Sequence, residues 1–167
     1  TGSGCIAVSL AKLGGYEAVA AADISVEALK VARKNADAIL GEGAVEFRHS
    51  DLFGSFDPAQ DRYDVIVSNP PYIPSEVIEG LEPEVRDFEP MMALDGMEDG
   101  LFFYRKIVSE SINYLNPCGW LMFEIGYDQG AQVSEMMKSV GYQEVKVIKD
   151  LAGLDRVVIG KLVQEER

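Results

Sequence analysis

The stretch YDVIVSNPPYIP, residues 63–74, joins an apolar run to a loop that contains three prolines. The run at 63–68 has the length and the branched apolar content of a buried strand. Proline fixes its own φ angle and keeps the preceding residue out of the helical region, so residues 69–74 can neither extend the strand nor easily begin a helix. We therefore predict a rigid loop at a strand end, which is where α/β proteins commonly carry their chemistry.

Around this loop, helical and extended patterns alternate along the chain. Ser25 is a good N-cap for a long helix that Gly41 can end. Further helices are predicted at 6–13, 101–115 and 129–140, and strands at 17–23, 45–49, 63–68, 120–125, 145–148 and 156–162. This alternation indicates an α/β fold with a doubly wound, mostly parallel sheet and helices on both faces. The linker at 149–155 is too short for a helical crossover, so the last two strands should form an antiparallel hairpin.

One long span, residues 74–100, has no clear periodicity and is acidic and rich in Pro and Gly. Irregular segments of this length are uncommon inside a compact domain and are usually functional. We predict that it forms a lid or a wall of a substrate-binding site.

Composition and charge narrow the class of protein. With 167 residues, 47% hydrophobic and 26% charged, the chain has the profile of one soluble globular domain. Proteins bind a phosphate backbone mostly through Lys and Arg. The net charge of −13 disfavours such binding, so a nucleic-acid partner is not expected. No apolar run is long enough for a membrane helix, and no group of residues has the spacing of metal ligands. We interpret Cys5 and Cys118, which stand far apart, as reduced core residues of a cytoplasmic protein.

Two segments of the first half can bind a nucleotide-like ligand. Gly2-Ser3-Gly4 forms a turn that lets a ligand approach the main chain, and Asp23 ends the next predicted strand, where a carboxylate can accept hydrogen bonds from a ribose diol. Asp51 ends a later strand beside Leu52-Phe53, and this pairing of an acceptor with an apolar wall suits an adenine ring. The alternative interpretations are that the glycine turn serves packing only, that Asp23 caps the following helix and that Asp51 caps a loop. NAD enzymes share this arrangement with methyltransferases that use S-adenosylmethionine, so these segments do not choose between the two.

The loop after residue 68 carries groups that can distinguish between these two classes of enzyme. The side-chain oxygen of Asn69 and the carbonyl of Pro70 are two acceptors in a fixed frame, and they suit the two hydrogens of a planar –NH2 group. Tyr72 can lie flat against the same group. Such a site aims a nitrogen lone pair at a methyl group placed in line with it, and positioning then supplies most of the rate. The alternative is a plain proline turn after a strand.

These residues resemble a known family. Asn69-Pro70-Pro71-Tyr72 after a strand is similar to the signature of class I methyltransferases that modify planar amino groups, which include adenine-N6 DNA methyltransferases and protein-glutamine N5-methyltransferases. Over essentially the whole chain, the sequence resembles the peptide chain release factor N5-glutamine methyltransferases (the HemK/PrmC family). The other stretches that carry this resemblance are TGSGCIA at 1–7, FEP at 88–90, ALDG at 93–96, EDGL at 98–101, FEIGYDQG at 123–130, DLAG at 150–153 and DRVV at 155–158.

The resemblance implies a Rossmann-like class I methyltransferase fold and a specific reaction. A methyl group would pass from S-adenosylmethionine, leaving S-adenosylhomocysteine, to the side-chain nitrogen of the glutamine in the Gly-Gly-Gln motif of release factors. The catalytic residues it implies, which would clasp the glutamine, are Asn69, Pro70, Pro71 and Tyr72. The cofactor-binding residues it implies are Thr1, Gly2, Ser3, Gly4 and Cys5 around the methionine part, Asp23 at the ribose, Asp51 and Leu52 at the adenine, and Asn69, which would touch both cofactor and substrate.

The chain departs from this family at its start. Family members have an N-terminal helical domain and a first strand that leads into the glycine turn, and their usual strand order is 3-2-1-4-5-7-6. Neither part precedes Thr1, so we expect residues 1–167 to be the catalytic domain of a longer chain, and we expect two strand edges to be exposed without the first strand. Two other hypotheses stay open. Adenine-N6 methylation of nucleic acid is opposed by the net charge, and a catalytically silent subunit that binds the cofactor is opposed by the intact proline loop.

Overall fold

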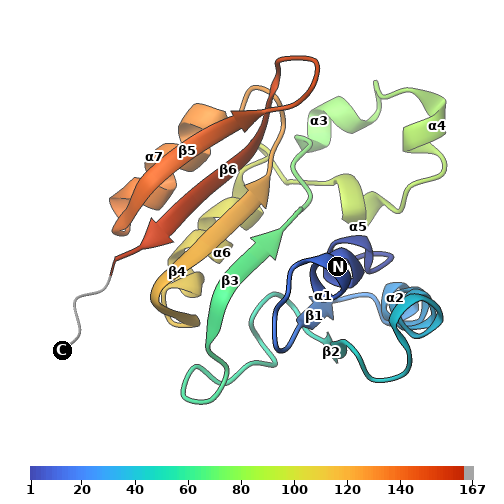
Figure 1. The fold of residues 1–167 in the computed structure, drawn as a ribbon. Helices are drawn as coiled ribbons and strands as arrows, with labels where there is room; N and C mark the ends of the chain where they lie inside the picture. The colour runs from blue at the N-terminus through green and yellow to red at the C-terminus, as the bar shows by residue number, and fades with distance from the viewer. Residues whose placement is uncertain (164–167) are drawn as a thin grey trace. The chain divides into compact units, whose positions relative to one another are not determined.

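The computed structural model describes residues 1–163, apart from the side chain of residue 85. The chain divides into two compact units, Thr1–Asp57 and Pro58–Arg167. In both units, helices and strands follow the alternation predicted from the sequence (Figure 1).

The first unit pairs two parallel strands with two helices. The elements in chain order are α1 (Cys5–Leu13), β1 (Ala20–Asp23), α2 (Val26–Leu40) and β2 (Glu46–His49). The strands pair from Ala20 opposite Glu46 to Asp23 opposite His49. The Oγ atom of Ser25 accepts a hydrogen bond from the backbone nitrogen of Ala28 at 3.2 Å, which confirms the predicted N-cap of α2. β1 is shorter than the predicted strand at 17–23 because β2 offers only four residues to pair with it.

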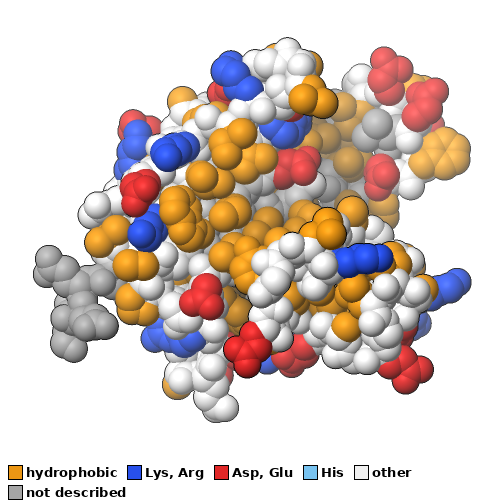
Figure 2. All heavy atoms as spheres, in the orientation of Figure 1, with side chains coloured by type: hydrophobic (Ala, Val, Ile, Leu, Met, Phe, Trp, Pro, Cys, Tyr) orange, Lys and Arg blue, Asp and Glu red, His pale blue; other side chains and the backbone are white. Residues whose placement is uncertain are grey.

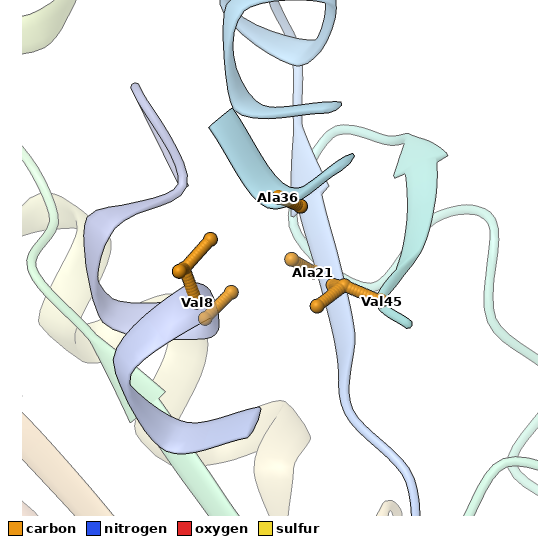
Figure 3. Packing of buried hydrophobic residues seen from close by; sticks show 5 residues of the cluster. Val8, Ala21, Ala36 and Val45 are labelled. Atoms are coloured by element: carbon orange, nitrogen blue, oxygen red, sulfur yellow. The ribbon is translucent and has the colours of Figure 1, made fainter. Parts of the chain in front are cut away.

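Small apolar side chains form the core of this unit. Val8 of α1, Ala36 of α2, Ala21 of β1 and Val45, which precedes β2, point toward one another (Figure 3). Ala36 is 1% exposed. Because alanine occupies so little space, the helices can approach the strand pair closely.

The second unit is built on a four-stranded sheet. Its strands are β3 (Tyr63–Ser68), β4 (Leu115–Glu124), β5 (Tyr142–Lys149) and β6 (Asp155–Leu162), in the spatial order β3-β4-β6-β5. β3 and β4 are parallel, whereas β6 is antiparallel to both β4 and β5. The predicted antiparallel hairpin at the end of the chain is therefore confirmed, and β3 has the predicted bounds.

Two longer helices, α6 (Phe102–Ser111) and α7 (Gly130–Ser139), lie on one face of this sheet (Figure 1). Leu121 and Phe123 of β4 are fully buried, while Trp120 and Met122, which alternate with them, are half-buried. Hydrophobic side chains are visible over β4 and β6 on the opposite face of the sheet (Figure 2). The alternation along β4 thus follows the two faces of the sheet.

The predicted boundary between the helix at 101–115 and the strand at 120–125 is wrong. α6 ends at Ser111, and β4 begins at Leu115, which pairs with Tyr63, whereas Trp120 pairs with Val65. The carbonyl of Tyr114 already accepts a hydrogen bond from the backbone nitrogen of Tyr63 at 2.8 Å. Pairing with β3 therefore draws this segment into the sheet, and the Pro-Gly segment at 116–119 is an irregularity within β4 rather than the end of a helix.

The span at 74–100 is more ordered than predicted. It holds three single-turn helices, α3 (Ser75–Ile78), α4 (Pro83–Arg86) and α5 (Met91–Leu94). Each begins at a proline or directly after one, since the fixed φ of proline suits the first turn of a helix. The two ends of the span are joined, because Ile73 donates to the carbonyl of Leu94 at 3.0 Å and accepts from Gly96 at 2.8 Å.

The interpretation of the cysteines is partly wrong. Cys5 and Cys118 are both free thiols, but both are exposed rather than in the core. Cys118 has a φ of 65° in the irregular segment of β4. Among the described residues, no helix combines the length and the apolar character that crossing a membrane requires.

Candidate active site

The glycine turn of the first unit leads directly into α1. Gly2 and Gly4 have φ values of 57° and 80°, a region that glycine enters without steric cost. A Cβ atom on Gly4 would lie 2.9 Å from the Cβ of Ala32, so α1 and α2 can meet here only at a glycine. A Cβ on Gly2 would meet nothing within 4 Å, so its backbone faces open space. The turn is therefore packed on one side and accessible to a ligand on the other.

Asp23 connects this turn to the end of β1. One oxygen, Oδ2, accepts hydrogen bonds from the nitrogens of Gly2 and Thr1, both at 2.8 Å, and Oδ1 accepts from the backbone nitrogen of Ser25 at 2.8 Å. Burial raises the pKa of Asp23, but the hydrogen bond and the charge of the terminal ammonium of Thr1, together with the hydrogen bonds from Gly2 and Ser25, hold the pKa below its ordinary value. A carboxylate has about four lone-pair sites, so Asp23 keeps acceptor capacity for a hydroxyl while it orders the turn.

Asn35 also holds the turn, and the sequence reasoning missed it. Its Nδ2 atom donates to the carbonyl of Ser3 at 2.9 Å. Asn35 lies on α2 between Ala32 and Ala36, which are both buried. A polar amide inside a stripe of small apolar residues was the available signal, because such a residue needs a partner.

Asp51 and Leu52 lie in a turn just beyond β2. Because β1 and β2 are parallel and Asp23 pairs with His49, this turn is at the same end of the strand pair as Asp23. The buried hydroxyl of Ser50 orders the turn, since it donates to the carbonyl of Leu52 at 2.9 Å and accepts from the nitrogen of Ser55 at 2.9 Å. Leu52 has a φ of 47°, which is strained for a side chain of this size and is a feature often found at functional sites.

A separate hollow of about 470 Å³ opens elsewhere on this unit. Among its lining residues are Arg33, Glu42 and Glu46. Glu46 begins β2, so the hollow lies toward the amino end of the strand pair, whereas Asp23 and Asp51 lie at its carboxyl end. We therefore do not assign it to the candidate site.

In the second unit, the loop at 69–72 follows β3 as predicted. Asn69 is exposed, Pro70 is buried and Tyr72 is half-buried. Within residues 1–163, neither the side-chain amide of Asn69 nor the carbonyl of Pro70 takes part in a hydrogen bond. The two acceptors predicted to bind an –NH2 group are thus not used by the protein within this range, and of the two residues Asn69 is the exposed one.

The environment of Tyr72 comes from several elements. Tyr104 of α6 donates its hydroxyl to the carbonyl of Glu124 at 3.0 Å. Burial raises the pKa of Tyr104, and the nearby hydroxyl of Tyr72 and carboxylate of Glu124 raise it further. The carbonyl of Tyr72 accepts a hydrogen bond from the side chain of Gln129 at 3.0 Å. The sequence reasoning had assigned no role to Gln129.

Comparison with known proteins agrees with these features. Residues 1–79 match the family model described as "Methyltransferase small domain". The release factor glutamine methyltransferase of Geobacter sulfurreducens is 44% identical over 96% of this chain and 55% of its own length. The enzyme of the same name from Clostridium acetobutylicum is 40% identical over 95% of this chain and 56% of its own length. This chain is related in sequence to the release factor glutamine methyltransferases. It spans about half the length of the curated relatives it matches.

Solved structures identify the fold. The ribosomal protein L11 methylase of Lactobacillus delbrueckii subsp. bulgaricus superposes with a TM-score of 0.65 at 23% identity, over 97% of this chain and 67% of its own. The fold is that of a class I methyltransferase. In the strand numbering of this class, β2-β1 corresponds to strands 3-2 and β3-β4-β6-β5 to strands 4-5-7-6. Within each sheet the neighbours follow the expected order, and the first strand of the class has no counterpart within residues 1–163.

Proposed function

We propose that the protein transfers a methyl group from S-adenosylmethionine to the side-chain nitrogen of the glutamine in the Gly-Gly-Gln motif of peptide chain release factors. The observation that carries this proposal is the pair of available acceptors on Asn69 and Pro70. The names of the relatives, which match almost the whole chain, support the same substrate.

The first unit offers groups that fit the cofactor. The open backbone at Gly2 suits the methionine part, the ionised carboxylate of Asp23 suits the ribose hydroxyls, and the side chain of Leu52 suits one face of the adenine. When bound, S-adenosylmethionine supplies a methyl group on a positively charged sulfur. Asp51 is exposed beside Leu52 and can accept a hydrogen bond from the exocyclic amine.

The second unit offers groups that fit the glutamine amide. The side-chain oxygen of Asn69 and the carbonyl of Pro70 accept its two N–H hydrogens, which orients the nitrogen lone pair. Tyr72 covers the plane of the amide. The bound cofactor would supply its methyl group to this nitrogen, and the electron pair of the broken S–C bond would stay on its sulfur. The nitrogen then loses one proton to solvent, so no general base is needed before transfer.

Mass spectrometry of a release factor tests this proposal. The full chain is incubated with S-adenosylmethionine and a release factor, in parallel with the Asn69→Ala variant. Asn113→Ala removes an exposed asparagine of the same unit and serves as the matched control. We expect one added methyl group on the Gly-Gly-Gln glutamine with the wild type and the control, and none with Asn69→Ala.

Two results would overturn the assignment. If no methyl group is added while cofactor binding is intact, the release factor is not the substrate. If adenine in nucleic acid is methylated instead, the chain acts as an adenine-N6 methyltransferase, and its nucleic-acid affinity should fall with salt.

A further inference from the structure

We propose that Gln129 is a positioning residue, whose side-chain amide holds the loop at 69–72 in the geometry that receives a substrate amide. This inference rests on the proposed function for the identity of the substrate. The contacts of Gln129 carry it independently of which amide is methylated.

Gln129 joins three segments that are far apart in the sequence. Its Nε2 atom donates to the carbonyl of Tyr72 at 3.0 Å and to the carbonyl of Gly100 at 3.3 Å. Its Oε1 atom accepts from the backbone nitrogen of Gly126 at 3.0 Å. The residue is 7% exposed, so these hydrogen bonds are shielded from water. Both amide hydrogens and one acceptor position are therefore used inside the protein.

This arrangement requires a neutral amide of this length. Glutamine presents two donors and one acceptor group, which is what two carbonyls and one N–H need. A glutamate would place an acceptor against the two carbonyls, and a methionine would leave all three backbone groups without their partner. Losing the partner of a buried polar group costs about 1–3 kcal/mol, so either change should release the loop.

Two glycines let the segment at 96–100 approach the backbone of Tyr72 closely. A Cβ on Gly96 would lie 2.8 Å from the Cα of Tyr72, and a Cβ on Gly100 would lie 2.3 Å from its carbonyl oxygen. The side chain of Asp99 fixes this segment, because it accepts hydrogen bonds from Arg105 at 2.8 and 3.0 Å. These bonds lower the pKa of Asp99 to about 2. The backbone of Tyr72 is thus in contact with both the glycine-containing segment and the Gln129 amide.

The Gln129 contact also decides which carbonyl remains for a ligand. The carbonyl of Tyr72 is occupied by Gln129, whereas the carbonyl of Pro70, two residues earlier, is not. The Tyr72 carbonyl therefore has less acceptor capacity left for a substrate than the Asn69 side chain and the Pro70 carbonyl. If Gln129 were absent, the Tyr72 carbonyl would become a competing acceptor close to the others.

Three variants of the full chain test this inference. Gln129→Met removes both donors and the acceptor at similar length, and Gln129→Glu keeps the shape but offers only acceptors. Gln132→Met changes an exposed glutamine of α7 and is the matched control. Each is measured for hydrogen exchange at residues 70–77, for the stoichiometry of cofactor binding by calorimetry, and for the methylation rate per cofactor-binding site at saturating release factor.

The expected result separates positioning from folding. The amides of Ile73 and Ser75, which donate to Leu94 and Met97 at 3.0 Å each, should exchange faster in both Gln129 variants but not in the control. Cofactor stoichiometry should be unchanged, while the rate per site falls about 100-fold, as for a displaced reactive group.

Two results would overturn the inference. One is unchanged exchange at 70–77. The other is a loss of activity that matches a loss of cofactor-binding sites, because a merely structural role would lower the number of active sites and not the rate of each. If the wild type methylates no release factor, the proposed function fails, yet the exchange measurement still decides whether Gln129 holds the loop.

Discussion

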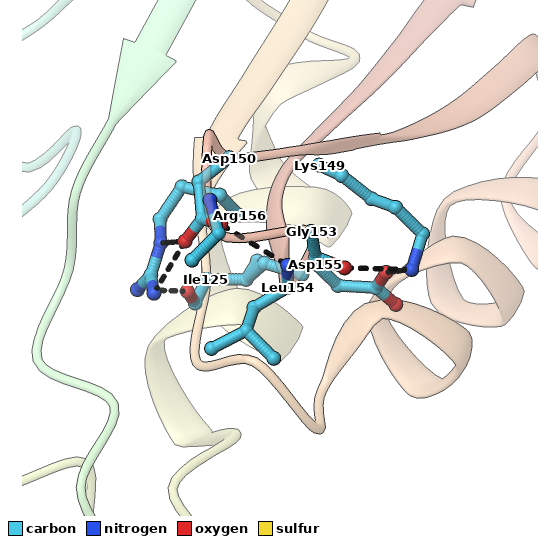
Figure 4. Close-up of polar contacts among 8 residues, drawn as sticks. Ile125, Lys149, Asp150, Gly153, Leu154, Asp155 and Arg156 are labelled. Carbon is cyan, nitrogen blue, oxygen red and sulfur yellow. Dashed lines mark hydrogen bonds and ion pairs between the residues drawn. The ribbon is translucent and has the colours of Figure 1, made fainter.

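Asp150 accepts two hydrogen bonds from the guanidinium of Arg156, at 3.2 Å from Nε and 3.1 Å from Nη2 (Figure 4). The other oxygen of Asp150 accepts from the backbone nitrogens of Ala152 and Leu154 at 2.9 and 3.0 Å. Arg156 also donates to the carbonyl of Ile125 at 3.3 Å. One carboxylate therefore orders the turn between β5 and β6, and its arginine partner connects that turn to the end of β4.

The first prediction concerns the pH dependence of this turn. Hydrogen bonds, first from Leu154 and then from Arg156, hold the pKa of Asp150 below its ordinary value of about 4. A lowered pKa means that the stabilisation is present above that ordinary value and is lost as the pH falls through the folded-state pKa. We expect Asp150→Asn to be less stable than the wild type at pH 7, and the difference to shrink in acid.

Urea unfolding at pH 7 and at pH 3 would measure this effect. Asp128→Asn, at an exposed aspartate of the loop after β4, controls for the loss of one charge. A constant difference between Asp150→Asn and the wild type at both pH values would contradict the prediction.

The second prediction uses two glycines with similar φ angles. Gly100 and Gly153 have φ values of 70° and 82°, but only a Cβ on Gly100 would meet other atoms. We expect Gly153→Ala to cost about 1 kcal/mol from backbone strain alone and Gly100→Ala about 2–4 kcal/mol, because the clash with Tyr72 adds to the strain. Denaturant unfolding of both variants measures the difference, and equal costs would show that the close approach to Tyr72 has no energetic consequence.

The third prediction concerns a buried hydroxyl pair. Tyr142 and Ser111 share a hydrogen bond of 2.7 Å, and both residues are buried. Tyr142→Phe should lower the free energy of unfolding by about 1 kcal/mol at neutral pH. Tyr127→Phe, at a tyrosine that is 64% exposed, should have little effect.

The Tyr142→Phe variant should also change how the free energy of unfolding depends on pH in alkaline solution. Burial raises the pKa of Tyr142 to about 12, although its bond with Ser111 opposes the shift. A raised pKa means that the stabilisation is complete below the unfolded-state pKa of about 10 and is lost as the pH rises toward the folded-state value. The unfolding free energy of Tyr142→Phe should therefore fall less steeply between pH 10 and about 12 than that of the wild type. Parallel curves for the two proteins would rule out this contribution.

The fourth prediction tests the support of the glycine turn. Asn35→Ala removes the hydrogen bond to the carbonyl of Ser3 and should weaken binding of S-adenosylmethionine by about fivefold, the equivalent of one neutral hydrogen bond. Calorimetric titration measures the affinity, with Asn113→Ala as the control outside this unit. An unchanged affinity in Asn35→Ala would show that the turn needs no support from α2.

Several features were predictable because local interactions determine them. The bounds of β3 follow from an apolar run that prolines interrupt, and the start of α2 follows from the hydroxyl of Ser25. The antiparallel hairpin of β5 and β6 follows from a linker that no helical crossover could use. In each case the deciding contact lies within a few residues along the chain.

Other features were not predictable because their partners are remote in the sequence. The helix predicted at 101–115 ends early since Tyr114 pairs with Tyr63, 51 residues away by their numbers. Gln129 and Gln132 belong to the same stretch of sequence, and nothing local shows that one is buried between two carbonyls while the other is exposed.

The sequence by itself determined the alternation of elements, the glycine turn and the proline loop that carries Asn69 and Pro70, because turn chemistry and apolar periodicity act locally. Only the tertiary structure decided how these parts are held. It placed the Gln129 amide on the Tyr72 carbonyl and the Asn35 amide on the Ser3 carbonyl. A buried hydrogen bond needs a donor and an acceptor that meet in space, and folding, not spacing along the chain, brings them together.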